Sequence, residues 1–289
     1  MTDRIEYLIF IFFSFLFKLI GIRSSRKISS VLAFIFFYII PVRKDTTIEN
    51  IARAFPEYSE GRVRKIAYGS YKSFAVALIE ILFIPWMKRE EVEKAVKCSN
   101  LDFVLKKYNE KKGILLISAH FGNWEYMAVS IGAQLKIPLY VVVKPQRNIF
   151  VTGWLDRMRT LWGNKIVPLG ISIRQIYKEL KDKNIIAMVA DQRGPAEGIR
   201  VNFFGRRTSV YPGPAILALK TGCPILYGIS VRQPDFSYRT EFYEISTDNL
   251  PADEEEKIIE VNQRMFDYLE SCVRKYPEQW LWQHKRWKY

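Results

Sequence analysis

The sequence predicts an α/β fold, a mostly parallel (mixed) sheet covered by helices on both faces, with an N-terminal hydrophobic membrane-associating helix or helical hairpin. Two observations lead to this prediction. From Gly113 onward, apolar β-branched runs alternate with helix-compatible segments, as in parallel sheets with crossover helices. Before Pro41 the chain is strongly apolar, and eight of its phenylalanines fall between Phe10 and Phe37.

Length and charge narrow the class of protein. A chain of 289 residues can form one large α/β domain with a sizeable core. The net charge is +14, with 44 Lys and Arg against 30 Asp and Glu, while 49% of residues are hydrophobic. Such a chain suits an anionic membrane or a nucleic acid. Basic residues are spread along the chain with no zinc-finger or RNA-recognition motif, so we expect a membrane partner and no nucleic acid.

Cysteine use gives no sign of covalent or metal chemistry. Cys98, Cys223 and Cys272 are far apart, which argues against a disulfide framework or a zinc site and fits a reducing compartment. We interpret all three as buried structural thiols. The sequence contains no metal-ligand cluster, so no metal and no cofactor are expected.

The N-terminal segment has the composition of a membrane helix. As a helix, residues 5–22 would extend for about 27 Å, close to the roughly 30 Å of a bilayer core, so they could cross a membrane or lie in its surface. Glu6 and Lys18 weaken the spanning case. Basic residues directly after this run place the downstream chain on the cytoplasmic side. The run 31–41 is too short to span and suits a surface or buried helix. The open alternative is that both runs are core helices.

The predicted elements follow in order. We divide the chain into a membrane-associating segment, 1–42, and a second domain, 43–289. Helices are expected to end at Ala54, to start at Ser59-Glu60 and to cover 100–109. Strands are predicted at 114–118, 138–143, 165–169, 185–190 and 224–231, with an antiparallel edge strand at 238–245. The intervening helices are predicted at 125–134, 153–162, 173–181, 214–221 and 254–275.

The stretch Ser118 to Glu125 (SAHFGNWE) carries the chemistry that we expect of this protein. It joins a buried strand to a helix, and the carboxyl ends of strands are where open α/β sheets place their sites. The chain has only two histidines, so His120 is a candidate general base and Glu125 a candidate carboxylate to orient it. In a regular helix, five residues would put the two side chains about 140° apart, so the turn would have to fold Glu125 back. A capping or core histidine is the alternative.

HFGNWE resembles the His-x4-Asp/Glu motif of the glycerophospholipid acyltransferase superfamily. With Glu as its carboxylate it is most similar to the late lipid A acyltransferase family, the lauroyl and myristoyl transferases of lipopolysaccharide synthesis. Further stretches match that family in the same order: KPQRN from Lys144, RMR from Arg157, ADQRGP from Ala190, FFG from Phe203, GPA from Gly213, TGCP from Thr221 and PEQWLWQHKRW from Pro277.

This resemblance implies a membrane-bound acyltransferase of the inner (cytoplasmic) membrane, with its catalytic domain on the cytoplasmic side. A fatty acyl chain would move from an acyl carrier protein or coenzyme A thioester to a hydroxyl of a glycolipid, here a lipid A precursor. His120 would be the general base and Glu125 its orienting carboxylate, without an acyl-enzyme. Within the superfamily, a lysophospholipid or a phosphoinositide mannoside is the alternative acceptor, and a non-catalytic membrane-binding relative is a further alternative.

The resemblance also marks residues for substrate binding. Asn123 is expected to bind substrate, and backbone N–H groups of the turn near it, or a nearby arginine, could stabilise an oxyanion. Arg159 is expected to hold a substrate phosphate, with Arg157 as its rival in register and a solvated structural arginine as the alternative. Asp191 is expected near the active site or as a turn cap, with Arg193 beside it. Lys144, Arg147 and Asn148 could bind the head group, or else be solvated. His284 is expected to be structural.

Overall fold

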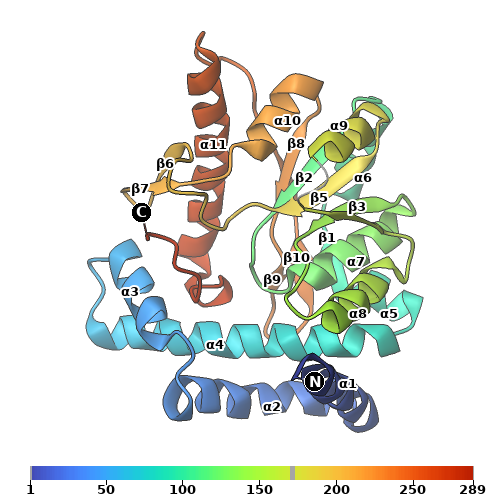
Figure 1. The fold of residues 1–289 in the computed structure, drawn as a ribbon, viewed down its shortest axis with the longest axis vertical. Coiled ribbons are helices and arrows are strands. Elements are labelled where there is room, and N and C mark those ends of the chain that lie inside the picture. Colours follow the sequence, from blue (N-terminus) through green and yellow to red (C-terminus); the bar gives the residue numbers. More distant parts are fainter. Residues whose placement is uncertain (1, 170–172, 289) are drawn as a thin grey trace.

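The computed structural model describes residues 2–169 and 173–288. Within them, a six-stranded sheet with the order β11-β8-β2-β5-β3-β4 forms the centre of the molecule (Figure 1). Five strands run parallel, and β11 pairs with β8 in the antiparallel direction at the edge. The predicted α/β class is therefore confirmed. The bounds of the strands are β2 Ile114–Ser118, β3 Leu139–Val143, β4 Lys165–Pro168, β5 Ile185–Val189, β8 Ile225–Gly228 and β11 Phe242–Ile245.

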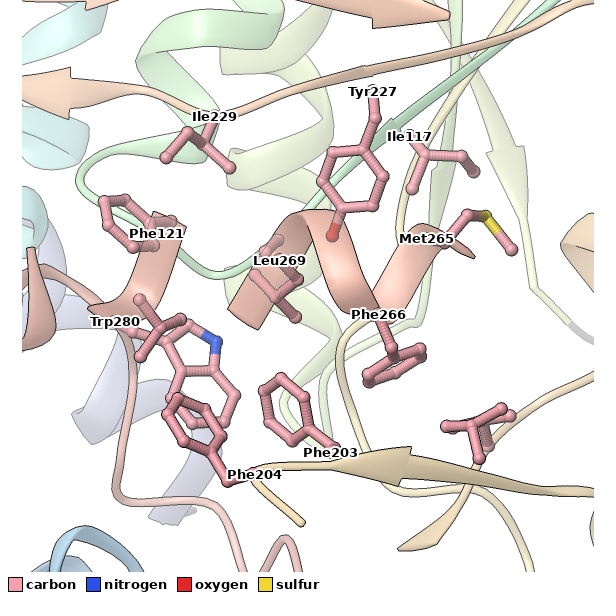
Figure 2. Packing of buried hydrophobic residues seen from close by; sticks show 14 of the residues in the cluster. Ile117, Phe121, Phe203, Phe204, Tyr227, Ile229, Met265, Phe266, Leu269 and Trp280 are labelled. Carbon is pink, nitrogen blue, oxygen red and sulfur yellow. The ribbon is translucent and has the colours of Figure 1, made fainter. Parts of the chain in front are cut away.

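Helices cover both faces of the sheet. On one face, the apolar sides of α9 (Ile173–Lys181), α10 (Gly213–Thr221) and α11 (Glu254–Lys275) share a core cluster with β2 and β8. Figure 2 shows part of this cluster, with α11 side chains beside Ile117 and Tyr227. The other face packs against α6 (Leu101–Asn109) and α7 (Trp124–Leu135), and α8 (Ile149–Thr160) follows β3 and contacts β4.

The register of β2 and β5 fixes the position of the site. Every residue of β2 is buried, since neighbouring strands flank both of its sides and helices cover both of its faces. Ser118, the last residue of β2, lies opposite Val189, the last residue of β5. The segments that follow these two strands therefore begin side by side at one edge of the sheet.

The N-terminal helices lie beneath this core, stacked on a long buried helix. The helix α1 (Thr2–Ile20) ends before Gly21, whose φ of 76° breaks the chain direction, and α2 (Ile22–Phe34) continues into a π-helical turn, Ile35–Ile39. Both helices pack on α4 (Glu60–Phe83), which α3 (Lys44–Ala54) precedes (Figure 1). The expected run 5–22 is thus almost entirely α1, and only Ile22 belongs to α2. The two helices joined at Gly21 are called the N-terminal hairpin below.

Among the described residues, one helix is by itself long and apolar enough to cross a membrane, Glu60–Trp86, and the N-terminal run is not. The bent pair Ile22–Ile39 and Lys44–Ala54, with 94° between its helices, would qualify only if it counted as one span. The most apolar window of Glu60–Trp86 is 67% buried inside the protein, so this helix packs as a core helix. Large apolar side chains of α1 and α2 are instead exposed to solvent. They are Ile5, Leu8, Ile9, Phe12, Phe13, Phe15, Leu19, Ile20, Val31 and Phe34.

Smaller elements complete the fold. A three-stranded sheet joins β1 (Val96–Cys98), β10 (Tyr238–Thr240) and β9 (Val231–Arg232), and a hairpin joins β6 (Arg200–Phe203) to β7 (Arg206–Ser209). The expected edge strand 238–245 is therefore two strands in two sheets, interrupted at Glu241. The remaining helices are α5 (Arg89–Ala95) and the 3-10 turns Ile84–Trp86 and Pro277–Gln279.

Candidate active site

His120 lies just beyond the end of the central strand β2 and pairs with Asp191. The ring Nδ1 is 2.7 Å from Asp191 Oδ1, and the backbone N–H of His120 donates to Asp191 Oδ2 at 3.0 Å. Asp191 follows β5, the parallel neighbour of β2, so the sheet register brings the two residues together. The pair therefore joins two strand ends that are 71 residues apart in the sequence.

The Asp191 carboxylate is buried and well supplied with donors. In addition to His120, the indole Nε1 of Trp280 donates to Oδ2 at 2.8 Å, and Asp191 is 3% exposed. Burial alone would raise the Asp191 pKa, but the charge of His120 and these hydrogen bonds lower the pKa overall. For His120 the signs reverse: burial alone would lower its pKa, whereas the charge and hydrogen bond of Asp191 raise it overall. Asp191 is thus a stable anion at neutral pH.

This pairing fixes the tautomer of His120. A carboxylate can only accept, so Nδ1 carries the hydrogen and Nε2 presents a lone pair. Nε2 lies 3.5 Å from the side-chain nitrogen of Gln192, which is exposed. The ring of Trp124 packs edge-on against the imidazole, with centroids 4.8 Å apart. The basic nitrogen of His120 therefore faces the accessible side of the site.

Glu125 forms an ion pair with Arg159. The guanidinium donates twice, from Nε to Oε2 at 2.9 Å and from Nη2 to Oε1 at 2.6 Å, and its Nη1 reaches Asp156 Oδ1 at 3.2 Å. Both Glu125 and Arg159 are 8% exposed. Burial alone would lower the Arg159 pKa, but the bonds and charge of Glu125 raise it overall. This bidentate pair joins the first turn of α7 to the last turn of α8.

The expected orienting role of Glu125 needs correction in this geometry. Both of its oxygens bind Arg159, and the carboxylate at Nδ1 of His120 belongs to Asp191. The physical reason is helical geometry, because Glu125 is already in the first turn of α7 and points toward α8. Glu125 still acts on His120 through space, since its negative charge contributes to the raised His120 pKa. Arg159 is buried and forms an ion pair with Glu125, so the alternative that it is a solvated arginine is wrong.

Asn123 lies inside the protein beneath the site. Its exposed fraction is 0%, its Oδ1 accepts from the backbone N–H of Tyr126 as the N-cap of α7, and its Nδ2 donates to Glu80. Both ends of the amide bind protein groups, so the side chain of Asn123 serves the turn, and the expected substrate contact stays a prediction for the backbone N–H groups near it. The preceding Gly122 has a φ of 55°, and a Cβ there would meet the carbonyl oxygen of Ser230 at 1.8 Å. The turn therefore requires glycine at 122.

Two of the three residues expected to bind the acceptor head group contact the N-terminal helix instead. The side chain of Asn148 caps α8 and donates to the Asp3 carbonyl and to Glu6. Arg147 also donates to Glu6, although its side chain is 78% exposed. Lys144 is exposed after β3. Lys144 and Arg147 stay open to a ligand, whereas Asn148 is a buried structural cap.

Arg193 and His284 belong to the contact between the 191–195 loop and the C-terminal tail. The backbone N–H of Arg193 donates to His284 Nε2 at 3.2 Å, and its guanidinium donates to the Lys285 carbonyl at 2.9 Å. Burial lowers the His284 pKa to about 4, so this imidazole is neutral and accepts. The expected structural role of His284 agrees with these contacts.

Two contributors to the site could not be assigned from the sequence alone. Trp280 lies in the C-terminal tail that carries the family resemblance, but its indole acts on a carboxylate 89 residues away. Glu80 lies in an apolar helix pattern, and nothing local indicates that it reaches Asn123.

Burial raises the pKa of all three cysteine thiols, so none of them is an activated thiolate.

The comparison with known families decides the identity of the chain. Residues 2–289 match the model of the bacterial lipid A biosynthesis acyltransferase family. The protein belongs to this family. It is therefore an acyltransferase, and its resemblance to late lipid A acyltransferases extends over the whole chain.

Individual relatives agree with this assignment. The lipid A biosynthesis palmitoleoyltransferase of Escherichia coli (strain K12) is 23% identical over 248 residues, 85% of this chain and 79% of the relative. The lipid A biosynthesis lauroyltransferase of the same organism is 24% identical over 241 residues, 83% and 77% of the two chains. The phosphatidylinositol mannoside acyltransferase of Mycolicibacterium smegmatis is 24% identical over 160 residues, 54% and 52% of the two chains.

Proposed function

We propose that this protein is a membrane-bound O-acyltransferase that transfers a fatty acyl chain from a thioester to a hydroxyl of a lipid A precursor. The donor is an acyl carrier protein or coenzyme A thioester. The observation that carries the proposal is His120 at the end of the central strand, with Nδ1 held by Asp191 and Nε2 facing the accessible side. The two Escherichia coli relatives, named for lipid A biosynthesis, support the acceptor.

The reaction needs one base and no acyl-enzyme. Nε2 of His120 takes the proton of the acceptor hydroxyl while the oxygen attacks the thioester carbonyl. The tetrahedral intermediate collapses with cleavage of the C–S bond, and the imidazolium returns its proton to the departing thiolate. The products are an ester and a free thiol. Asp191 keeps the imidazole in the required tautomer and stabilises the imidazolium.

The oxyanion of the intermediate requires fixed donors. The first turn of a helix has backbone N–H groups without intrahelical acceptors, and its dipole favours negative charge. The helix α7 begins at Trp124, whose ring contacts His120. The Tyr126 and Met127 N–H groups already donate to Asn123, so we assign oxyanion stabilisation to the N–H groups of Trp124 and Glu125. Arg159 is the alternative donor, but its charge is already opposed by Glu125.

Membrane attachment is assigned to the N-terminal hairpin. Its exposed apolar side chains suit insertion into the headgroup and acyl boundary of an anionic bilayer. The hairpin would lie in the membrane surface, because α1 alone is not long and apolar enough to span and one side of it packs on α4. The catalytic residues would then act on lipids of the cytoplasmic side of the inner membrane. Residues 1–42 remain the proposed membrane-associating segment, and 43–289 the proposed acyltransferase domain.

A second acceptor has support from one relative. The mycobacterial protein that matches about half of this chain is named for acylation of phosphatidylinositol mannoside. A phosphoinositide mannoside is therefore the second candidate. The head group is a matter of specificity, and the base and its carboxylate would act in the same way.

The test is acyl transfer by purified protein on phospholipid vesicles that contain either a lipid A precursor or a phosphoinositide mannoside. Acyl carrier protein and coenzyme A donors are compared, and mass spectrometry identifies the product. His120→Ala is expected to lower the rate by about 10³-fold or more. Wild-type activity in His120→Ala would show that His120 is not the catalytic base. A strong preference for the phosphoinositide mannoside would show that this lipid, rather than a lipid A precursor, is the acceptor.

A further inference from the structure

A buried carboxylate lies directly beneath the turn that carries the catalytic histidine. Glu80 of α4 has an exposed fraction of 0%, although α4 is otherwise apolar in this region. Its Oε2 accepts from Asn123 Nδ2 at 2.9 Å and from the Tyr238 hydroxyl at 2.6 Å. Its Oε1 accepts from Arg26, with Nε at 2.8 Å and Nη2 at 2.7 Å. A buried charge is tolerated only with such partners, so this cluster is a specific construction.

The contact with Glu80 fixes the orientation of Asn123. The amide oxygen must accept from the Tyr126 N–H, and the amide nitrogen must donate to the carboxylate, so the side chain cannot flip. Asn123 precedes Trp124, the first residue of α7, whose ring packs against His120. The position of Asn123 therefore determines where α7 starts relative to the imidazole.

The counter-ion of Glu80 comes from the N-terminal hairpin. Arg26 of α2 turns inward, its side chain is 14% exposed, and its guanidinium lies 5.1 Å from the centroid of Phe236. The neighbouring Lys27 and the residue one turn later, Val31, are exposed on the outer side of α2. One helix thus presents Lys27 and Val31 outward and the balancing charge of the catalytic turn inward.

We propose that Glu80 is a positioning residue for acyl transfer, with Arg26 as its obligatory counter-ion. Glu80 holds Asn123, and Asn123 holds the start of α7 against His120. Seating of the N-terminal hairpin on α4 and the geometry of the catalytic turn are thereby coupled through one ion pair. This inference rests on the proposed role of His120 as the base.

Two double variants test the positioning role without leaving a buried charge unpaired. Arg26→Met/Glu80→Gln removes both charges but keeps an oxygen that can accept from Asn123 and Tyr238. Arg26→Met/Glu80→Leu removes the same charges and the acceptor, with a side chain of similar size. We expect kcat of the Gln variant within about threefold of the wild type, and kcat of the Leu variant lower by about 10- to 100-fold with little change in KM.

A spectroscopic measurement separates positioning from general loss of structure. Because the chain has only two histidines, ¹⁵N-histidine spectra resolve the His120 ring directly. The His120 signal should move in the Leu variant and stay near its wild-type position in the Gln variant. Equal kcat and equal His120 signals in the two double variants would overturn the inference. If His120→Ala stays active, the proposed function fails instead, so the two failures are distinguishable.

Coupling to the hairpin has its own test. Arg26→Met leaves Glu80 without its cation, so we expect lower kcat but unchanged co-sedimentation with anionic vesicles, because Arg26 faces inward. Lys220→Met is the control for loss of one positive charge: Lys220 is exposed on α10, away from the hairpin and from His120, so this variant should keep wild-type kcat. Equal kcat in the two single variants would overturn the coupling.

Discussion

Asp191 carries the buried negative charge that makes His120 a usable base. Three hydrogen bonds hold this carboxylate, two from His120 and one from Trp280, and the anion in turn selects the Nδ1–H tautomer. Asp191→Asn keeps the shape but offers an amide in place of an anion. We expect the rate to fall by about 10³- to 10⁴-fold, as when the carboxylate of a catalytic triad is replaced. Steady-state kinetics on vesicles measures this loss, and a decrease below tenfold would contradict it.

The same pair sets the pH dependence. Acyl transfer needs neutral His120, and Asp191 raises its pKa, so kcat/KM should decline as pH falls through that raised value. In Asp191→Asn the attraction is gone and burial dominates, which lowers the His120 pKa. The acidic limb of the residual activity should therefore move to lower pH. A limb that stays in place or moves to higher pH would exclude His120 as the titrating base.

The Glu125–Arg159 pair is expected to act mainly on structure. Removal of one partner leaves an uncompensated buried charge, so Glu125→Gln and Arg159→Met should each destabilise the fold by about 3 kcal/mol. The double variant should be less destabilised than the sum of the two, because neither charge is then left alone. Denaturant unfolding gives the three values. Strict additivity would show that the two side chains do not stabilise each other.

At the scale of elements, the sequence predicts what depends on local pattern. The strand 114–118 and the helix 254–275 agree with the structure at both ends, because apolar runs and 3.6-residue periodicity identify them. The division of 238–245 at Glu241 could not be predicted, since its alternation continues while the chain leaves one sheet for another. The same limit applies to the site. His120 is prominent as one of two histidines, but only the register of β2 and β5 reveals its partner.

The hairpin of α1 and α2 should attach the protein to membranes through its exposed apolar side chains. Leu8 and Phe12 are 64% and 60% exposed on α1. Insertion of two such side chains contributes about 3 kcal/mol, so Leu8→Glu/Phe12→Glu should lower partitioning into anionic vesicles by roughly 100-fold. Tyr243→Glu, at an exposed position of the edge strand β11, is the control and should bind as the wild type. Equal binding of both variants would place the membrane surface elsewhere.

Over the whole molecule, the positive charge affects how a donor arrives. The net charge of +14 gives a field that attracts an anionic carrier protein, and salt screens such fields over about 8 Å at physiological ionic strength. With an acyl carrier protein donor, kcat/KM should therefore fall steeply as salt rises from 50 to roughly 500 mM, mainly through KM, since steering acts on association. An uncharged short thioester, such as an acyl N-acetylcysteamine, is the matched control, because nothing steers it. Its kcat/KM should stay nearly constant over the same range, which also shows that the site itself tolerates salt. Equal salt dependence with both donors would mean that the positive charge serves the anionic membrane rather than the donor protein.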